Sequence, residues 1–283
     1  MAPRSPASPT VRSRTAAQAA RSKAAASAAV SPRTAAAPVA GASQARPQYT
    51  RVLLKISGEG FCEPGGFGID RAALDRVAGE IERVARLGVQ IAVVVGGGNF
   101  LRGHDFAQEL GIELATADYM GMLATVINAL ALQEALERRG LDTRVQSALT
   151  ITRVCEPFIR RRALRHMEKG RVVILAAGTG NPHVTTDSCA ALRAVELRAE
   201  ALLKGTKVDG VYDDDPQRNP AARRYDRLNY NQVIDGRLKV MDVSAVDICQ
   251  QHHLPIVVFN LFQPDTMRRV ILGEPLGTTV SEG

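Results

Sequence analysis

Short apolar runs alternate with longer segments of helical spacing along most of the chain. Runs rich in Val, Ile and Leu predict strands at 51–56, 89–95, 143–147, 171–176, 201–204 and 256–259. Apolar positions three and four residues apart predict helices at about 70–87, 118–139, 159–169, 185–197, 243–251 and 265–272. Strands separated by helices indicate βαβ units. We therefore expect an α/β protein, a three-layer αβα sandwich with helices on both faces of a largely parallel sheet.

Glycine and polar residues mark the segments where we expect chemistry. In open parallel sheets, ligands bind beyond the carboxyl ends of the strands. Three of the expected strands end in glycine-bearing turns, at 55–59, 96–99 and 178–182. The segment 204–232 is rich in Asp, Pro, Asn and Arg and shows little periodicity. We interpret this segment as a functional loop region.

The basic charge of the chain lies in its first 50 residues. The whole chain carries 36 Lys+Arg and 29 Asp+Glu, a formal net charge of +7. Seven basic and no acidic side chains lie in residues 1–50, so residues 51–283 hold 29 of each sign. Residues 1–48 are rich in Ala, Ser, Pro and Arg, and we expect a disordered leader followed by a folded domain at 49–283. Such a leader fits a bacterial cytosolic protein, and it also resembles an organellar transit peptide.

Composition excludes several classes of protein. No apolar run approaches the roughly 18 residues of a membrane span, so we expect no membrane partner. Four cysteines, at positions 62, 155, 189 and 249, lack CxxC spacing, which fits a reducing compartment and no structural zinc. With no Trp and only 4% aromatic residues, the chain has no base-stacking platform, and we expect no nucleic-acid partner.

The three glycine turns together favour an anion site with room for more than one phosphate. Glycines let backbone N–H groups approach phosphate oxygens, and the helix start at Thr186 and Asp187 adds positive potential. Lys55 and Arg102 supply full charges beside the first two turns. Any one such turn is more often an ordinary tight loop, and a strand-end lysine commonly reaches solvent. The chain lacks a GxxxxGKS or GxxxxGKT run, which excludes a P-loop kinase.

Seven segments, in a characteristic order and spacing, resemble the bacterial-type UMP kinases of the amino acid kinase superfamily. They are LLKISGE (53–59), GGFGID (65–70), VVVGGGNFLRG (93–103), DYMGMLAT (118–125), GTGNPHVTTDS (178–188), LKGTKVDGVYDDDP (203–216) and LKVMD (238–242). The resemblance covers about residues 49–282. It implies an amino acid kinase domain at 49–283, with a UMP-binding N-terminal part and an ATP-binding C-terminal part. The implied activity is direct in-line transfer of the ATP γ-phosphoryl group to UMP, giving UDP in pyrimidine nucleotide biosynthesis.

The resemblance also implies roles for individual residues. Its catalytic residues are Lys55, which bridges donor and acceptor oxygens, Asp187, which orients that lysine, and Arg102, which reaches phosphate. The implied ATP-binding residues are Lys55, Ile56, Ser57, Gly58, Gly98, Arg102, Thr206, Tyr212 and Asp215. The implied UMP-binding residues are Gly97, Asp118, Thr179, Gly180, Asn181, Pro182, His183, Val184, Thr185 and Thr186. Read from the residues alone, Asp118 and Asp187 also suit helix capping, a role that can coexist with ligand binding at Asp118, and 213–215 also suits a solvated acidic turn.

The chain departs from the family pattern in the loop expected to hold uracil. The family usually has two aromatic residues after GTGNP, where this chain has His183 and Val184. A histidine can stack on a base, whereas valine cannot, so base selectivity is open. A solvent-facing His183 without a role is the other interpretation.

Further properties follow from the resemblance alone. Magnesium is expected on the ATP phosphates, as MgATP, without a dedicated protein metal ligand. A cytoplasmic homohexamer is implied, and the apolar helix 120–136 is a candidate subunit contact. GTP activation and UTP inhibition are implied through a segment near 63–68. Two rivals stay open: a sister kinase acting on a carboxylate or carbamate, and a non-catalytic nucleotide-binding or oxyanion-storage protein of the same fold.

Overall fold

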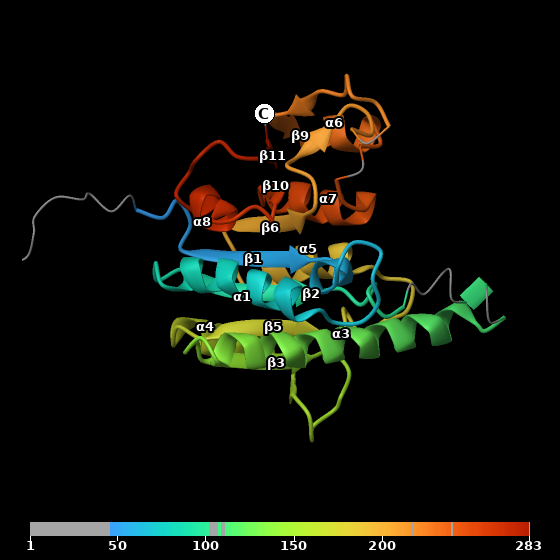
Figure 1. Cartoon of the computed structure of the whole chain (residues 1–283), viewed down its shortest axis with the longest axis vertical. Coiled ribbons are helices and arrows are strands. Elements are labelled where there is room, and N and C mark those ends of the chain that lie inside the picture. Colours follow the sequence, from blue (N-terminus) through green and yellow to red (C-terminus); the bar gives the residue numbers. More distant parts are fainter. Residues whose placement is uncertain (1–45, 102–106, 109–110, 217, 239, 283) are drawn as a thin grey trace, which may run out of the picture. The chain divides into compact units, whose positions relative to one another are not determined.

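A nine-stranded sheet organises the residues that the structure describes, which are 46–101, 107–108, 111–216, 218–238 and 240–282 (Figure 1). In this computed structural model the strand order is β4-β3-β5-β2-β1-β6-β10-β11-β9. The strands are β1 (Arg51–Ile56), β2 (Gln90–Val95), β3 (Thr143–Ser147), β4 (Glu156–Pro157), β5 (Val172–Ala176), β6 (Ala201–Thr206), β9 (Arg227–Asn229), β10 (Ile256–Asn260) and β11 (Thr278–Ser281). All neighbours pair in parallel except β10 and β11, which confirms the expected sheet.

Helices cover both faces of the sheet because successive strand side chains point to opposite sides. On one face Leu54 of β1 belongs to the core formed with α1 (Arg71–Ala85), α3 (Leu114–Glu137) and α8 (Thr266–Ile271). On the other face Leu53 belongs to a second core, and the helices there are α4 (Arg160–Glu168), α5 (Thr186–Glu196), α6 (Tyr230–Asp235) and α7 (Val243–Gln251). The three-layer α/β architecture predicted from the sequence is therefore confirmed.

The structure corrects two of the expected elements. The helix predicted from residue 118 begins four residues earlier, at Leu114, because the small apolar residues before Asp118 extend it. The segment 204–232 is not simply a loop region. Besides the end of β6, it contains β9, the start of α6, and a two-stranded antiparallel pair formed by β7 (Val211–Tyr212) and β8 (Arg224–Tyr225). These strands are only two or three residues long, so they leave no periodic signal.

Helix α3 differs from the sequence prediction in a second way. Over an 18-residue window its mean hydropathy is 1.3, which by length and composition alone is enough to cross a membrane. The prediction that no segment approaches this limit is wrong in that sense. In the structure α3 packs one face on the protein core, although only 39% of the window is buried. Its other face is open, and it carries exposed Leu123 and Ile127.

The folded region begins at a short anchored segment before β1. The Gln48 backbone N–H donates to the Ile271 carbonyl at 2.7 Å, at the end of α8. Thr50 donates through its backbone N–H and its hydroxyl to the two carboxylate oxygens of Glu200, at 2.7 and 2.5 Å. The expected leader at 1–48 lies outside the described residues except for its last three positions.

Candidate functional site

The glycine turns predicted from the sequence meet at one edge of the sheet. Strands β5, β2, β1 and β6 are consecutive neighbours and run in the same direction. Their carboxyl ends therefore lie side by side. The segments that leave these ends begin at Ala177, Gly96, Ser57 and Lys207.

Two lysines share one carboxylate at this edge. The Nζ atom of Lys55 lies 2.7 Å from Asp187 Oδ1, and the Nζ atom of Lys204 donates to Asp187 Oδ2 at 2.8 Å. All three side chains are 15% exposed or less. Burial alone raises the pKa of the Asp187 carboxyl, but the two ammonium groups outweigh burial and hold the pKa below its usual value. Burial also lowers the pKa of Lys204, whereas Asp187 opposes that shift.

The sheet register creates this cluster. Lys55 of β1 and Lys204 of β6 are direct partners on neighbouring parallel strands, so their side chains leave the same face. Two ammonium groups placed this way repel each other unless a carboxylate lies between them. Asp187, in the first turn of α5, supplies that carboxylate. The helix itself is capped by the Thr185 hydroxyl, which accepts from the Ser188 backbone N–H, so Asp187 is not the capping residue.

Lys204 and Asp242 are site residues that the sequence interpretation missed. Lys204 also donates to the Val240 carbonyl at 2.5 Å, which fixes its ammonium group between two segments. Asp242 accepts a short hydrogen bond from the hydroxyl of Thr185, which joins the start of α7 to the start of α5. Both residues lie inside motifs that carry the family resemblance. Nothing in the strand pattern distinguishes Lys204 from a surface lysine.

Glycine is required where the turns after β1 and β2 touch. A Cβ on Gly58 would lie 2.3 Å from the Gly98 backbone nitrogen, and one on Gly96 would lie 2.7 Å from the Gly58 nitrogen. A Cβ on Gly97 would lie 2.6 Å from the Gly121 carbonyl of α3. Gly98 faces open space, which leaves its backbone accessible. The two turns thus pack backbone against backbone beside Lys55.

Several residues expected to bind UMP line a cavity of about 150 Å³ next to these turns. Its lining is Gly97, Leu101, Asp118, Gly121, Met122, Thr125, Gly178, Val184, Thr185 and Thr186. Asp118 lies in the second turn of α3, so its interpretation as a plain helix cap is wrong. One of its carboxylate oxygens accepts from the His183 backbone N–H at 2.8 Å.

His183 has a backbone conformation that few non-glycine residues adopt. Its φ is +64°, and this geometry turns its N–H toward Asp118. The imidazole is 64% exposed, and its Nδ1 is 3.9 Å from the Asp118 carboxylate. Val184 lines the cavity, although its side chain is also exposed. Exposed and half-buried residues of the same loop, Thr179, Gly180, Asn181 and Pro182, complete the predicted uracil segment.

Six of the nine residues expected to bind ATP line two further cavities. One, of about 280 Å³, is lined by Lys55, Ile56, Ser57, Glu59, Gly60, Lys204, Gly205, Thr206, Lys207, Val208 and Phe262. Because Ile56 is 1% exposed, its contribution to a ligand is limited to the backbone. The other, of about 490 Å³, includes Tyr212 and Asp215. Arg102, expected to reach phosphate, lies outside the described residues.

A polar network holds the Tyr212 side chain. Its hydroxyl donates to Asp209 Oδ1 at 2.6 Å, and Arg224 donates to Asp209 Oδ2 at 3.0 Å. The hydrogen bond to Asp209, followed by burial, raises the pKa of Tyr212. Thr206 uses its hydroxyl within its own turn, where it donates to the Val208 carbonyl at 2.6 Å.

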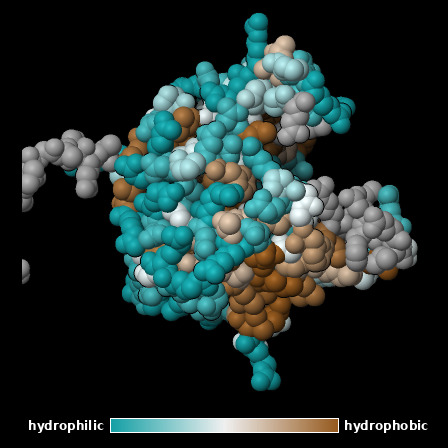
Figure 2. Space-filling view, viewed as in Figure 1, coloured by the Kyte–Doolittle hydropathy of each residue, from teal (hydrophilic) through white to brown (hydrophobic). Residues whose placement is uncertain are grey.

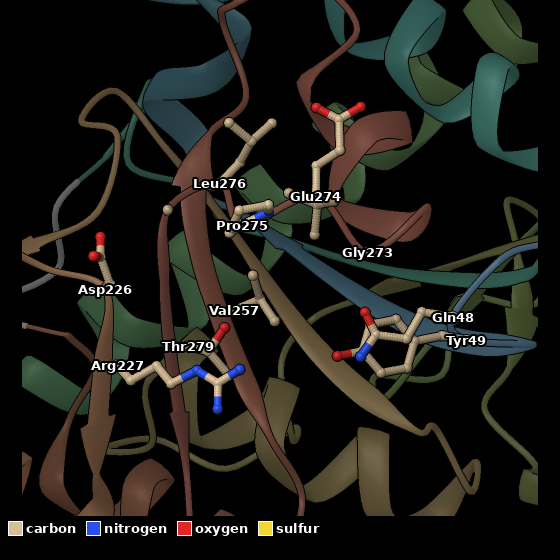
Figure 3. A pocket seen from close by; sticks show the side chains of 12 residues that line it. Gln48, Tyr49, Asp226, Arg227, Val257, Gly273, Glu274, Pro275, Leu276 and Thr279 are labelled. Atoms are coloured by element: carbon tan, nitrogen blue, oxygen red, sulfur yellow. The ribbon is translucent and has the colours of Figure 1, made fainter. Parts of the chain in front are cut away.

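One cavity of about 210 Å³ lies apart from the predicted site residues (Figure 3). It is lined by the segment before β1, by β9 and by the loop that joins α8 to β11, including Gln48, Tyr49, Arg227, Glu274 and Thr279. None of its lining residues carries a sequence-predicted role. The candidate site is therefore the edge that holds Lys55 and Asp187.

Comparisons with known proteins show the family to which the chain belongs. Residues 50–260 match the model of the amino acid kinase family. A curated uridylate kinase from Zymomonas mobilis is 58% identical over 235 residues, which cover 83% of this chain and 97% of the relative. The crystal structure of UMP kinase from Bacillus anthracis has a TM-score of 0.81 at 40% identity and covers 84% of this chain and 97% of that one. UMP kinase from Ureaplasma parvum has a TM-score of 0.78 at 37% identity, covering 83% and 100%.

Proposed function

The chain belongs to the amino acid kinase family, and we infer that it is a uridylate kinase, which transfers the γ-phosphoryl group of ATP to UMP. The relationship to UMP kinases extends over more than four-fifths of the chain and almost the whole length of each relative. The resemblance found in the sequence motifs is thereby confirmed. The alternative of a non-catalytic protein on the same fold is not favoured, because Lys55 and Asp187 are both present and paired.

The observation that carries this function is the Lys55–Asp187–Lys204 cluster beside the glycine turns. Phosphoryl transfer between two anions depends on positioning and on positive charge close to the transferring group, with little covalent help from the protein. Lys55 lies beside both turns, so its ammonium group is placed to bridge donor and acceptor oxygens. Asp187 fixes the direction of Lys55, and Lys204 adds a second positive charge at the same carboxylate.

The UMP side is assigned to the cavity between α3 and the loop 178–186. Gly97 offers its backbone to the UMP phosphate, and Asp118 accepts hydrogen bonds from the ribose hydroxyls. Because the His183 N–H occupies one Asp118 oxygen, UMP binding and the position of this loop are linked. The remaining loop residues, Thr179 to Thr186, wrap the base and phosphate, with Val184 on the cavity wall.

The ATP side is assigned to the cavities that run from the first glycine turn to β7. Lys55, Ser57, Gly58 and Gly98 receive the phosphates, the first through its charge and the others through backbone N–H groups. Thr206, Tyr212 and Asp215 border the base. The cavity that contains Thr206 is also lined by Lys55 and Lys204, which supports the proposal that the end of the triphosphate lies at the lysine cluster.

Magnesium is expected to arrive on the nucleotide. Among the described residues, no group of three or more His, Cys, Asp or Glu side chains is arranged to hold a metal ion. A magnesium ion that arrives on ATP is held by phosphate oxygens and water and needs few protein ligands. When bound, the ion neutralises phosphate charge, and the lysines of the protein act on the oxygens that it leaves free.

A second copy of the chain is proposed to cover the open face of α3, as one contact of a homohexamer. Figure 2 shows hydrophobic residues gathered over this helix, and the exposed large side chains of α3 are those of Tyr119, Met120, Leu123 and Ile127. Monomeric soluble proteins rarely expose contiguous apolar patches of this kind without a partner. Leu123→Glu is expected to give smaller particles in size-exclusion chromatography with light scattering, whereas Glu168→Ala on exposed α4 is expected to leave particle size unchanged.

Compartment and regulation are proposed on the family relationship alone. We place the enzyme in the cytoplasm, with an organelle as the alternative if residues 1–48 are a transit peptide. GTP activation and UTP inhibition are expected to act through the exposed segment near 63–68. Activity titrations with each nucleotide test this.

One assay tests the proposed function directly. The full chain is incubated with ATP, magnesium and one acceptor, either UMP, CMP or acetylglutamate, and ADP formation is followed. We expect turnover with UMP to exceed the others by orders of magnitude. No turnover on UMP, or equal turnover on CMP, would contradict the assignment. Acetylglutamate represents the carboxylate kinases of the same fold.

A further inference from the structure

We propose that a buried amide pair, Asn99 and Asn128, holds the two glycine turns in register for phosphoryl transfer, and that Asn128 is a positioning residue on α3. The proposal rests on the proposed function, because it concerns turns that are assigned to ATP and UMP. Neither side chain needs to touch a substrate. Asn128 is 0% exposed and Asn99 is 3% exposed.

The two side chains form a closed pair of amide hydrogen bonds. Asn99 Nδ2 donates to Asn128 Oδ1 at 2.9 Å, and Asn128 Nδ2 donates to Asn99 Oδ1 at 2.7 Å. The second hydrogen of each amide is also used. Asn99 donates to the Gly68 carbonyl, and Asn128 donates to the Gly96 carbonyl, both at 2.8 Å. All four amide hydrogens therefore have an acceptor in the protein.

The amide pair lies next to the place where the two turns touch. Gly58, in the expected ATP-phosphate turn, has no room for a Cβ because that atom would lie 2.7 Å from Asn99 Oδ1. Gly96 begins the second turn, and Asn128 holds its carbonyl. The Gly68 backbone N–H also donates to the Asn99 carbonyl at 2.9 Å. A shift of either amide would thus move the first turn, which is assigned to ATP, against the second turn, which is assigned to both substrates.

The same face of α3 makes two more contacts with the substrate turns. Gly97 has no room for a Cβ because it approaches the Gly121 carbonyl of the helix closely. The Thr125 hydroxyl accepts from the Ala177 backbone N–H at 2.7 Å, where the uracil loop leaves β5. Gly121, Thr125 and Asn128 are spaced by four and three residues, so they form one stripe on the helix. Leu123 and Ile127 lie on the open face.

A buried site that only stabilises the fold does not require two hydrogen-bonded amide side chains. Apolar side chains of similar volume often fill a buried site with equal stability, because they bury no polar groups. A fully satisfied amide pair instead specifies one arrangement of the groups that it joins. The amide pair joins the backbones of the turns that are assigned to the substrates. It therefore specifies the position of these turns.

Asn128→Ala tests the proposal in the full chain. We expect kcat to fall by about a hundredfold, since small displacements of positioned groups cost that much, with a smaller change in KM for either substrate. The matched control is Leu132→Ala. Leu132 lies one turn further along α3, is 0% exposed, and has an apolar side chain that makes no hydrogen bond. This variant should lower Tm as much or more while its kcat stays within twofold of the unmodified chain.

A double-variant cycle shows whether Asn99 and Asn128 act as one unit or as two independent residues. Asn99→Ala should lower kcat as much as Asn128→Ala does. The kcat of the double variant should be no lower than that of the slower single variant. Should Asn128→Ala not fold, Asn99→Ala carries the same prediction, because its side chain leaves a turn and not a core helix. Hydrogen exchange at residues 93–101 gives a readout independent of activity, and it should accelerate in Asn128→Ala but not in Leu132→Ala.

Two results would overturn the proposal. One is a kcat for Asn128→Ala that matches Leu132→Ala at temperatures well below both melting transitions. The other is a double variant whose fold-loss in kcat equals the product of the fold-losses in kcat of the two single variants. If the unmodified chain lacks UMP-dependent ADP formation, the proposed function fails instead. The exchange experiment then still decides whether the amide pair holds the turn.

Discussion

The two ends of the proposed ATP site are built in opposite ways. The phosphate end consists of Lys55, Lys204 and Asp187, whose side chains are 15% exposed or less and come from three elements, β1, β6 and α5. The base end consists of the hairpin of β7 and β8, which is tied to the sheet through the Thr278 hydroxyl but whose other side-chain hydrogen bonds are mostly local and exposed. Asp214, for example, accepts from Asn219 five residues later at 2.9 Å.

This difference assigns different tasks to the two ends. A buried charge cluster that is fixed by neighbouring strands cannot adjust, so it suits the transition state, where position decides the rate. A locally bonded exposed hairpin reshapes at little cost to the rest of the fold, so it suits binding of a base that does not react. We expect changes at the phosphate end to lower kcat and changes at the base end to raise the KM for ATP.

The largest expected effect is that of Lys55→Ala. Loss of the charge beside both glycine turns should lower kcat by about a thousandfold with folding intact, since removal of a single transition-state contact reaches this size. Steady-state kinetics and a thermal melt measure both properties. The control is Lys169→Ala at the exposed end of α4, which should keep full activity. An unchanged kcat in Lys55→Ala would remove Lys55 from the mechanism.

Lys204→Met should have the next largest effect, a loss of about a hundredfold in kcat. The effect should be smaller than for Lys55 because part of the Lys204 ammonium group is already committed to the Val240 carbonyl. Lys204→Arg is the conservative comparison, and it should recover part of the rate by restoring the charge. A rise in ATP KM with unchanged kcat would instead move Lys204 to the binding end of the site.

The lowered pKa of Asp187 predicts that the stability of the folded chain depends on pH. Its pKa in the folded protein lies below the ordinary value of about 3.9, so its contribution is fully present above that pH. That contribution is lost as the pH falls through the lower, folded pKa. The free energy of unfolding of the unmodified chain should therefore approach that of Asp187→Asn between about pH 4 and pH 2. Urea unfolding across this range measures it, and a constant difference would contradict the ion-pair assignment.

The smallest expected effect belongs to the base end. Tyr212→Phe removes the hydroxyl that donates to Asp209 and should raise the KM for ATP about threefold, the value of one ordinary hydrogen bond. We expect kcat and the KM for UMP to stay unchanged. Initial-rate kinetics with each substrate varied in turn tests this. A loss of kcat comparable to Lys204→Met would erase the distinction between the two ends.

Sequence reasoning identified the elements whose signal is local. Strands β1, β2 and β5 are buried on both faces, so they appear as continuous apolar runs and were predicted within one residue. Strands β9 and β11 were missed because each has four residues or fewer, and their pairing joins Arg227 to Thr279. Such a pair has no periodic pattern, and only the fold brings its members together.

The site shows the same division between local and long-range information. The glycine turns and Asp187 were predicted because their motifs are contiguous. Lys204 was missed because its importance depends on the register of β6 against β1. Asn128 was also missed, although a polar residue inside an otherwise apolar helix was a usable signal. Its partner Asn99 is 29 positions away, so the pair is visible only in three dimensions.

The anchored segment before β1 has a practical consequence. Gln48 and Thr50 are bound at the amino end of β1, whereas the proposed catalytic cluster begins near the carboxyl end of the same strand. A label, a purification handle or a solid support attached upstream of Gln48 therefore joins the domain at the edge opposite the reaction. Immobilising the enzyme through its amino end should leave substrate access open, which makes this end the natural point of attachment for a reusable catalyst.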